Sequence, residues 1–200
     1  MELRKKLQCH DFNWFLKNVI PHKFIIDEQS NYYGRLKTSG YENICVDHLQ
    51  VRNRAQKGLR VLVTCGIRIL HDTGASLLSI VLQRDKGHHL SPYTLGQYAC
   101  HAFLGSSQYF CHSKKGEFRN EYMCAEERNG KIEMYACHGG TGQRWDYDSA
   151  SGQLKHQQSG LCLSAPADQP ANMASGQELV AVDCLESDSK QSWKFDHHNK

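Results

Sequence analysis

The stretch that decides the fold is residues 116–145, GEFRNEYMCAEERNGKIEMYACHGGTGQRW. It opens on a glycine followed by polar, apolar and basic residues, contains two cysteines, and closes on Gln-x-aromatic. The same ordered landmarks recur on both sides of it, and self-similarity of this kind indicates repeats of one structural unit. The three units share these landmarks: Gly34–Lys37, Cys45, Cys100 and Gln108–Phe110; Gly116–Arg119, Cys124, Cys137 and Gln143–Trp145; Gly152–Lys155, Cys162, Cys184 and Gln191–Trp193.

Short strands are the predicted elements of each unit, because short apolar runs alternate with Gly, Asn, Asp and Ser. One such unit cannot close a core alone, but three can form a pseudo-threefold barrel with a hairpin cap. We therefore predict an all-β fold, a β-trefoil. The closing aromatic residues should share the core, and the glutamine amides should satisfy backbone groups of the turns. These pairs are Gln108 with Phe110, Gln143 with Trp145, and Gln191 with Trp193.

The first unit is longer than the others, since its two cysteines are 55 residues apart, against 13 and 22 in the other units. We place the extra chain at residues 51–89, which lack every landmark of the repeat and contain two apolar runs, 59–63 and 77–82. These runs are compatible with a hairpin or short helix packed on the barrel, or with an unstructured insertion. A splice or gene-model insertion and a genuine elaboration both remain open, because loop closure costs grow only logarithmically with length.

A different pattern precedes the repeats. Asp11 is a candidate helix cap, and Phe12, Phe15, Leu16 and Val19 follow helical spacing before Pro21. We predict one amphipathic helix within residues 1–22, a linker over 23–32, and the trefoil over 33–196.

Composition excludes several classes of protein. Lys plus Arg number 24 and Asp plus Glu 21, a net charge of +3, which is too even for a nucleic-acid binder. No apolar run is long enough for a membrane span, and the N-terminus lacks the apolar region of a secretory signal. The nine cysteines include no Cys-x-x-Cys, so disulfides in an oxidising compartment are favoured over a redox motif or zinc ribbon. We therefore expect a C-terminal piece of a longer secretory-pathway protein.

Several of these residues resemble a known family. Cys45-Val46-Asp47, the Cys-His pairs at 100–101 and 137–138, and the three Gln-x-aromatic motifs resemble the ricin-type β-trefoil lectin repeat. Residues 7–21, LQCHDFNWFLKNVIP, resemble the last catalytic-domain helix of polypeptide N-acetylgalactosaminyltransferases, in which such a lectin domain follows directly. The resemblance implies one disulfide in each repeat: Cys45–Cys100, Cys124–Cys137 and Cys162–Cys184. Cys9, Cys65 and Cys111 are then left over, with at least one free thiol if the chain is alone.

The resemblance also implies a sugar site. A carboxylate can accept two hydroxyl protons of a galactose-type sugar, while an aromatic ring covers its apolar C–H face. The first repeat offers Asp47, Tyr98 and His101, with Ser107 at the family's amide position. A weaker second site consists of Glu126, Tyr135 and His138, with Gly142 at the amide position. Ser164 stands at the carboxylate position of the third repeat, which we interpret as structural. The competing interpretation is that Asp47 caps a turn and that the tyrosines are ordinary strand residues.

The Cys-His pairs are poor metal sites, since adjacent ligands rarely chelate one ion tetrahedrally, so we expect no metal in this chain. No motif supports Cys111 as a nucleophile. The leading hypothesis is a module, not catalytic by itself, that binds GalNAc-bearing glycopeptides in the Golgi lumen. Its partner in cis would be the family's manganese-dependent catalytic domain, with no nucleic acid and no membrane span involved. The alternative is a decayed trefoil that serves as a scaffold or protein-contact domain.

Overall fold

The computed structural model describes residues 10–49, 93–102, 106–167 and 176–198. The described residues fall into two units, the first with residues 10–23 and the second with the described residues from 24 on. In the first unit the described element is α2 (Phe12–Asn18). The elements of the second unit are α3 (Ile26–Gln29), β1 (Ser30–Thr38), β2 (Ile44–His48), β3 (Tyr93–Ala99), η1 (Ser106–Gln108), β4 (Phe110–Ser113), β5 (Phe118–Arg119), β6 (Met123–Arg128), β7 (Lys131–Ala136), η2 (Thr141–Gln143), β8 (Trp145–Tyr147), β9 (Leu154–His156), β10 (Cys162–Ser164), β11 (Gln177–Glu178), β12 (Val180–Val182), η4 (Ser189–Gln191) and β13 (Trp193–His198).

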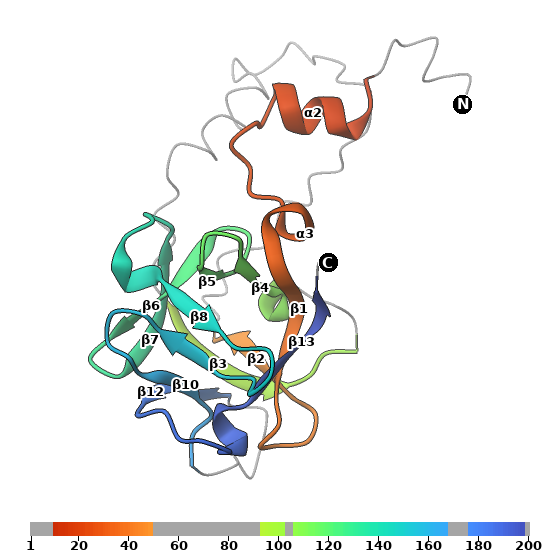
Figure 1. Cartoon of the computed structure of the whole chain (residues 1–200). Helices are drawn as coiled ribbons and strands as arrows, with labels where there is room; N and C mark the ends of the chain where they lie inside the picture. Colours follow the sequence, from red (N-terminus) through yellow and green to blue (C-terminus); the bar gives the residue numbers. More distant parts are fainter. Residues whose placement is uncertain (1–9, 50–92, 103–105, 168–175, 199–200) are drawn as a thin grey trace, which may run out of the picture. The chain divides into compact units, whose positions relative to one another are not determined.

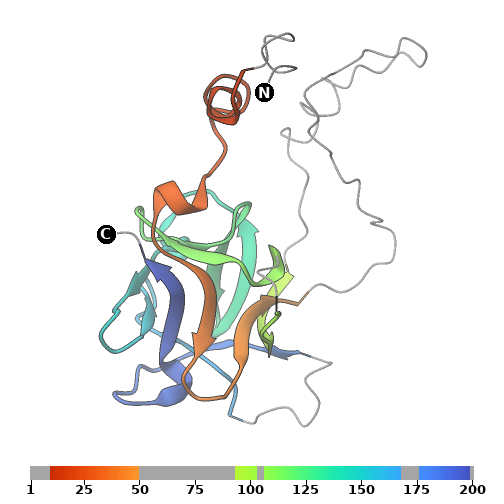
Figure 2. The same ribbon diagram turned by 90° about the vertical axis from the view of Figure 1, so that its right-hand side faces the viewer.

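The strands of the second unit form one continuous antiparallel sheet that encloses a common interior (Figures 1 and 2). Each repeat contributes one hairpin: β2–β3, β6–β7 and β10–β12. The three hairpins meet pairwise. β3 pairs with β7, β7 pairs with β12, and β11, which lies just before β12 in the chain, pairs with β3. The first and last strands, β1 and β13, pair as well. This closed threefold arrangement confirms the predicted β-trefoil.

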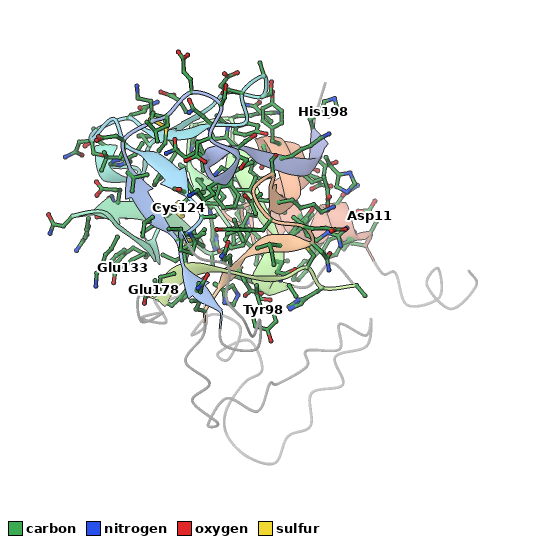
Figure 3. The ribbon with its side chains drawn as sticks, turned by 90° about the horizontal axis from the view of Figure 1, so that it is seen from below. Asp11, Tyr98, Cys124, Glu133, Glu178 and His198 are labelled. Atoms are coloured by element: carbon green, nitrogen blue, oxygen red, sulfur yellow. A yellow bond between two sulfur atoms is a disulfide. The ribbon has the colours of Figure 1, made fainter. Side chains whose placement is uncertain are left out.

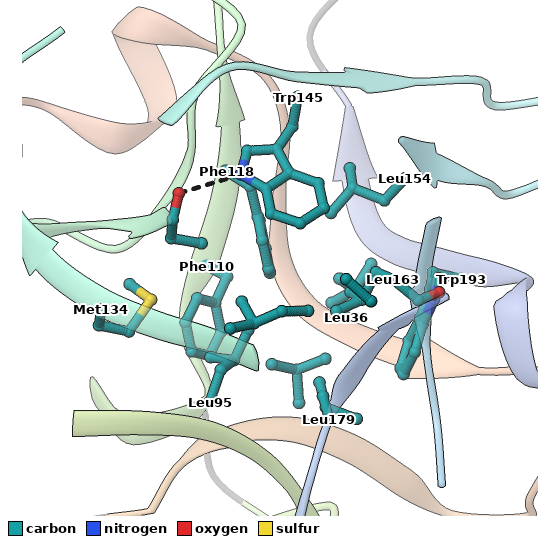
Figure 4. Close-up of a cluster of buried hydrophobic side chains, with 14 of the residues drawn as sticks. Leu36, Leu95, Phe110, Phe118, Met134, Trp145, Leu154, Leu163, Leu179 and Trp193 are labelled. Atoms are coloured by element: carbon teal, nitrogen blue, oxygen red, sulfur yellow. Dashed lines mark hydrogen bonds between the residues drawn. The ribbon is translucent and has the colours of Figure 1, made fainter. Parts of the chain in front are cut away.

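The core gathers side chains from all three repeats, as the close-up in Figure 4 shows. Phe110, Trp145 and Trp193 are at most 1% exposed, so the closing aromatic residues do share one interior. The two indoles also donate hydrogen bonds to the backbone. Trp145 Nε1 donates to the carbonyl oxygen of Ala125 at 3.0 Å and Trp193 Nε1 to that of Leu163 at 2.8 Å. Each acceptor is the residue directly after the first cysteine of its repeat, so the second and third repeats are equivalent in this contact as well as in sequence.

The three glutamines of the Gln-x-aromatic motifs form what we call the glutamine clamps. In each clamp the side-chain oxygen accepts one backbone N–H and the side-chain nitrogen donates to one backbone carbonyl, at 2.8–3.1 Å. The glutamines are at most 1% exposed, so these amides satisfy backbone groups that would otherwise be unpaired near the core. The predicted role of the glutamine amides is confirmed. The clamped pairs are His101 N and Ala99 O for Gln108, His138 N and Ala136 O for Gln143, and Leu185 N and Asp183 O for Gln191.

All three implied disulfides are present, with Cα–Cα distances of 5.0–5.1 Å: Cys45–Cys100, Cys124–Cys137 and Cys162–Cys184. Within the described residues Cys111 is a free thiol, buried on β4. Burial raises the pKa of this thiol to about 11. The disulfide framework is therefore as expected. Three other predicted features lie outside the described residues: Cys9, Cys65 and the insertion at 51–89.

The start of the barrel differs from the prediction. Residues 23–32 are not a plain linker, because they contain α3 and the first residues of β1, with Ile26 and Ser30 buried. Gly34, the first landmark of the first repeat, lies inside β1 at a register shift, with φ at +114°. An added Cβ at Gly34 would lie 3.0 Å from the Cβ of Asp196 on β13, so glycine allows the close approach of β1 and β13.

The predicted N-terminal helix is confirmed as α2, described here by itself. Asp11 caps it by accepting a hydrogen bond from Trp14 N at 2.7 Å. Phe12 and Trp14 are large exposed apolar side chains of this helix. Neither α2 nor any other helix in the described residues has the length and apolar character to cross a membrane.

Candidate functional site

The β2–β3 hairpin of the first repeat places Asp47 and Tyr98 on one face. In its register Cys45 pairs with Tyr98 and Asp47 with Gly96, so Asp47 and Tyr98 are diagonal neighbours. His101 lies two residues after the end of β3, and its ring lies 6.1 Å from the Tyr98 ring in an edge-on arrangement. Tyr98 is labelled on this hairpin in Figure 3. The structure thus brings together the carboxylate, ring and imidazole predicted from sequence.

One oxygen of the buried Asp47 carboxylate is held by the protein. Oδ2 accepts a hydrogen bond from Gln108 Nε2 at 2.9 Å and a long one from Ser107 Oγ at 3.5 Å, and His101 Nε2 lies 3.7 Å away. Within the described residues, Oδ1 accepts no hydrogen bond. Burial raises the pKa of Asp47, with Gln108, His101 and Ser107 opposing the shift. The site therefore offers a fixed carboxylate that has one oxygen without a described partner.

The turn-cap interpretation of Asp47 is not supported. Asp47 lies within β2, and its described hydrogen bonds come from side chains, Gln108 and Ser107, and not from backbone N–H groups of a turn. Gln108 therefore has two roles, since the amide that clamps the backbone of the first repeat also orients the carboxylate. Ser107 contributes only the long hydrogen bond to Asp47, since it has a short hydroxyl side chain where the family has an amide.

Sequence reasoning missed Arg35 on β1. Its Nη1 donates to the His101 carbonyl oxygen at 3.0 Å, while its Nε donates to Asp196 Oδ2 at 2.7 Å. Lys37 Nζ lies 2.8 Å from the other oxygen of Asp196. Arg35 therefore anchors the backbone of the site to the barrel. Its place in the repeated glycine tetrad does not reveal this contact, because Arg35 and His101 are 66 residues apart and meet only in the closed barrel.

The second repeat has the same arrangement of carboxylate, ring and imidazole, but its carboxylate has more hydrogen-bond partners. On β6–β7, Cys124 pairs with Tyr135, so Glu126 and Tyr135 are diagonal neighbours. Glu126 Oε2 accepts from His138 Nε2 at 3.1 Å and Gln143 Nε2 at 3.2 Å. Burial would raise the pKa of Glu126, but its hydrogen bonds and the nearby guanidinium of Arg128 outweigh that and lower it.

Arg128, which sequence reasoning also missed, engages the remaining oxygen. Its Nε and Nη2 lie 2.9 and 2.7 Å from Glu126 Oε1. Its guanidinium carbon lies 4.4 Å from the centroid of the Tyr135 ring. Both oxygens of Glu126 are therefore bound by side chains of this chain.

The third repeat has neither carboxylate nor ring at these positions. Ser164 Oγ donates to the carbonyl oxygen of Ala165 at 2.9 Å, and Val182 stands two residues before Cys184, where the other repeats have tyrosine. Asp183 is exposed. The geometry agrees with a structural role for this repeat.

The sequence profile of the ricin-type beta-trefoil lectin domain matches residues 79–193, more than half of the chain. The chain belongs to this family. Curated relatives of this lectin domain include "Probable N-acetylgalactosaminyltransferase 9" of Caenorhabditis elegans, 33% identical over 196 residues, which are 97% of this chain and 27% of that protein. "Polypeptide N-acetylgalactosaminyltransferase 6" of Homo sapiens is 26% identical over 205 residues, 98% of this chain and 25% of that protein. The chain therefore spans about a quarter of the length of these relatives.

Solved structures share the fold. The crystal structure of GalNAc-T7 with UDP, GalNAc and Mn2+ superposes with a TM-score of 0.56 at 16% identity, covering 98% of this chain and 28% of that one. The agglutinin from Abrus precatorius gives 0.50 at 17% identity, covering 83% and 49%. The family resemblance read from the lectin repeats is thus confirmed, and the relatives are the transferases that residues 7–21 suggested.

No group of three or more His, Cys, Asp or Glu side chains in the described residues is arranged to hold a metal ion. Asp196 and His198 are two residues apart on β13. Both oxygens of Asp196 are engaged, by Arg35 and Lys37, so this carboxylate serves an ion pair between β1 and β13.

Proposed function

We propose that the lectin domain is the carbohydrate-binding module of a glycosyltransferase of mucin-type O-glycosylation, and that its first repeat binds N-acetylgalactosamine on glycopeptides. The observation that carries the proposal is the Asp47 carboxylate, buried and oriented by Gln108, with its second oxygen unbound by any described residue. A carboxylate in this state can accept hydroxyl protons of a sugar in charge-assisted hydrogen bonds.

The neighbouring groups complete the chemistry. The Tyr98 ring offers an apolar face for the C–H side of the sugar, and His101 supplies a half-exposed imidazole beside Asp47. Ser107 supplies a hydroxyl where an amide would reach further. With so few polar contacts we expect a dissociation constant on the order of 1 mM for the free monosaccharide.

The whole protein would be a UDP-sugar transferase that places N-acetylgalactosamine on Ser or Thr with manganese in its catalytic domain. This proposal rests on the names of the relatives, of whose length the chain spans about a quarter. The lectin domain itself would be non-catalytic and would steer the enzyme, in the Golgi lumen, toward glycopeptides that already carry the sugar.

The test is retention of the oxidised 200-residue chain on immobilised N-acetylgalactosamine, with elution by the free sugar. Asp47→Ala should abolish retention. Asp183→Ala is the matched control, since Asp183 is an exposed aspartate of the third repeat, and should leave retention unchanged. Equal retention of Asp47→Ala and the unsubstituted chain would refute the first-repeat site.

A structural trefoil that acts as a scaffold is the second candidate. It is favoured by the long Ser107–Asp47 contact and by the occupied carboxylate of Glu126. This candidate predicts a folded, disulfide-bonded barrel whose melting temperature does not change at high N-acetylgalactosamine concentration. A rise in melting temperature that depends on Asp47 excludes it.

A further inference from the structure

The second repeat contains a cation at a position where the other repeats have none. By offset from the first cysteine of each repeat, Arg128 stands four residues after Cys124, as Leu49 stands four after Cys45 and Pro166 four after Cys162. The apolar side chain of Leu49 lies over Gly96, where an added Cβ would overlap it, and offers no donor to Asp47. Among the described residues, the second repeat is therefore the one that places an arginine beside its carboxylate.

Arg128 makes the two kinds of contact that a sugar would make at this hairpin. Its Nε and Nη2 bind Glu126 Oε1, which is where hydroxyl protons would be donated. Its guanidinium lies over the Tyr135 ring at 4.4 Å, which is where an apolar sugar face would stack. The ring is held for this contact, because Tyr135 Oη donates to Glu133 Oε2 at 2.7 Å. Cys124 and Glu133 of this hairpin are labelled in Figure 3.

We propose that Arg128 is an internal substitute for ligand, which fills the second sugar position and keeps it closed. The rest of that position is intact, since Gln143 donates to Glu126 as Gln108 donates to Asp47, and an imidazole lies beside each carboxylate, His138 at 3.1 Å and His101 at 3.7 Å. Gly142 leaves room beside the carboxylate, because an added Cβ there would meet Glu126 only at ordinary contact distance, 3.5 Å. The inference rests on the proposed sugar binding by this fold, but it concerns a different repeat.

We expect the ion pair between Arg128 and Glu126 to open and close. The Arg128 side chain is 53% exposed, and an ion pair with that much solvent around it is weak and sensitive to salt. A ligand that must displace Arg128 binds only to the fraction of molecules in which the pair is open, so its apparent dissociation constant is raised by the inverse of that fraction. The repeat is thus a sugar position with its own competitor.

The experiment uses the oxidised 200-residue chain carrying Asp47→Ala, so that the first repeat is silent, and measures retention on immobilised N-acetylgalactosamine. Adding Arg128→Leu, which installs the residue of the first repeat, should increase affinity on the order of tenfold if the pair is closed nine-tenths of the time. Adding Glu126→Ala to that chain should remove the gain. Lys131→Ala is the matched control, because it removes one exposed positive charge from the same hairpin, opposite Arg128, and should give no gain.

Two further readouts separate closure from a general effect of charge. Arg128→Lys keeps the charge but loses the two-pronged contact and the stacking, so it should give an intermediate gain. Raising the salt concentration should increase retention of the chain with Arg128 and not of the chain with Leu. If the Asp47→Ala/Arg128→Leu chain melts cooperatively and is retained no better than Asp47→Ala alone, the inference is wrong. Retention that depends on Asp47 in the original chain would then still support the proposed function, and a gain through Arg128→Leu would stand even if Asp47 proved inactive.

Discussion

Replacing the clamp glutamines distinguishes their contribution to the fold of this lectin domain from their contribution to the proposed sugar site. Gln108 and Gln191 each bind two backbone groups, but only Gln108 also donates to a carboxylate, Asp47 Oδ2 at 2.9 Å. Leucine has a similar volume and no polar atoms, so Gln→Leu leaves one N–H and one C=O without their partner in either repeat. We expect the fold to tolerate both substitutions and the sugar site to tolerate only one.

The expected magnitudes follow from the bonds lost. Each unsatisfied backbone group costs about 1–3 kcal/mol, so Gln191→Leu should lower the free energy of unfolding by about 2–4 kcal/mol, given that Leu185 and Asp183 are exposed residues. Gln108→Leu should cost about 1–2 kcal/mol more, because a hydrogen bond to a buried charged group is also lost. Domains of this size have about 5–15 kcal/mol to lose, so both variants should fold.

The assay is urea denaturation of the oxidised chain, followed by tryptophan fluorescence, together with retention on N-acetylgalactosamine. Gln191→Leu should shift the midpoint and keep retention, whereas Gln108→Leu should shift it further and abolish retention. If Gln191→Leu costs less than about 0.5 kcal/mol, the clamps do not stabilise the barrel as buried hydrogen bonds should. If Gln108→Leu is retained normally, Gln108 does not hold Asp47 for binding.

Four other outcomes are expected. Serine substitution of both cysteines in the first repeat, whose disulfide spans 55 residues, should cost about 4 kcal/mol in chain entropy, against about 3 kcal/mol for the second repeat, which spans 13; thermal melting compares them. Cys111, with its pKa of about 11 and no exposure, should resist alkylation at pH 8 in the folded chain and react in urea, as mass mapping would show. Burial lowers the pKa of His112 despite its bond to the Trp145 carbonyl oxygen, so the unfolded chain takes up the proton first. Stability should therefore fall as pH drops below the unfolded value of 6.5, and His112→Gln should flatten the melting temperature between pH 7.5 and 5.5. Asp47→Ser, which copies Ser164, should abolish retention while the melting temperature changes little.

The barrel was predictable from sequence because its landmarks have one structural reason each. The aromatic of Gln-x-aromatic fills the core, the glutamine satisfies the backbone, and the cysteines join the two strands of a hairpin. Repetition made these signals visible even across an interval of 55 residues. The start of the barrel was missed because β1 pairs with β13, about 160 residues away, and a contact at that distance leaves no local pattern before Gly34.

The carboxylates and rings of the site were predictable from sequence, but the side chains that bind each carboxylate were not. Position in a repeat identifies Asp47 and Glu126, whereas the state of each carboxylate depends on side chains that the landmarks do not include. Arg128 reaches Glu126 because alternate residues of a strand share a face. Arg35 reaches His101 only through the closed barrel. The first contact could have been found by reading alternate residues of each hairpin, while the second needed the fold.

The third repeat supports the proposed role of the acidic residue at position 47. Gln191 makes the same two backbone bonds as its counterparts although Ser164 provides no carboxylate, so the fold closes without an acid at this position. A buried carboxylate costs free energy unless it is paired, and the raised pKa of Asp47 shows that burial outweighs its hydrogen bonds. A group that the fold does not need, and that is held at a cost with one oxygen unbound by the described residues, is what a binding site requires. By the same reasoning, the ion pair with Arg128 removes the cost of burying the Glu126 carboxylate and closes the second sugar position.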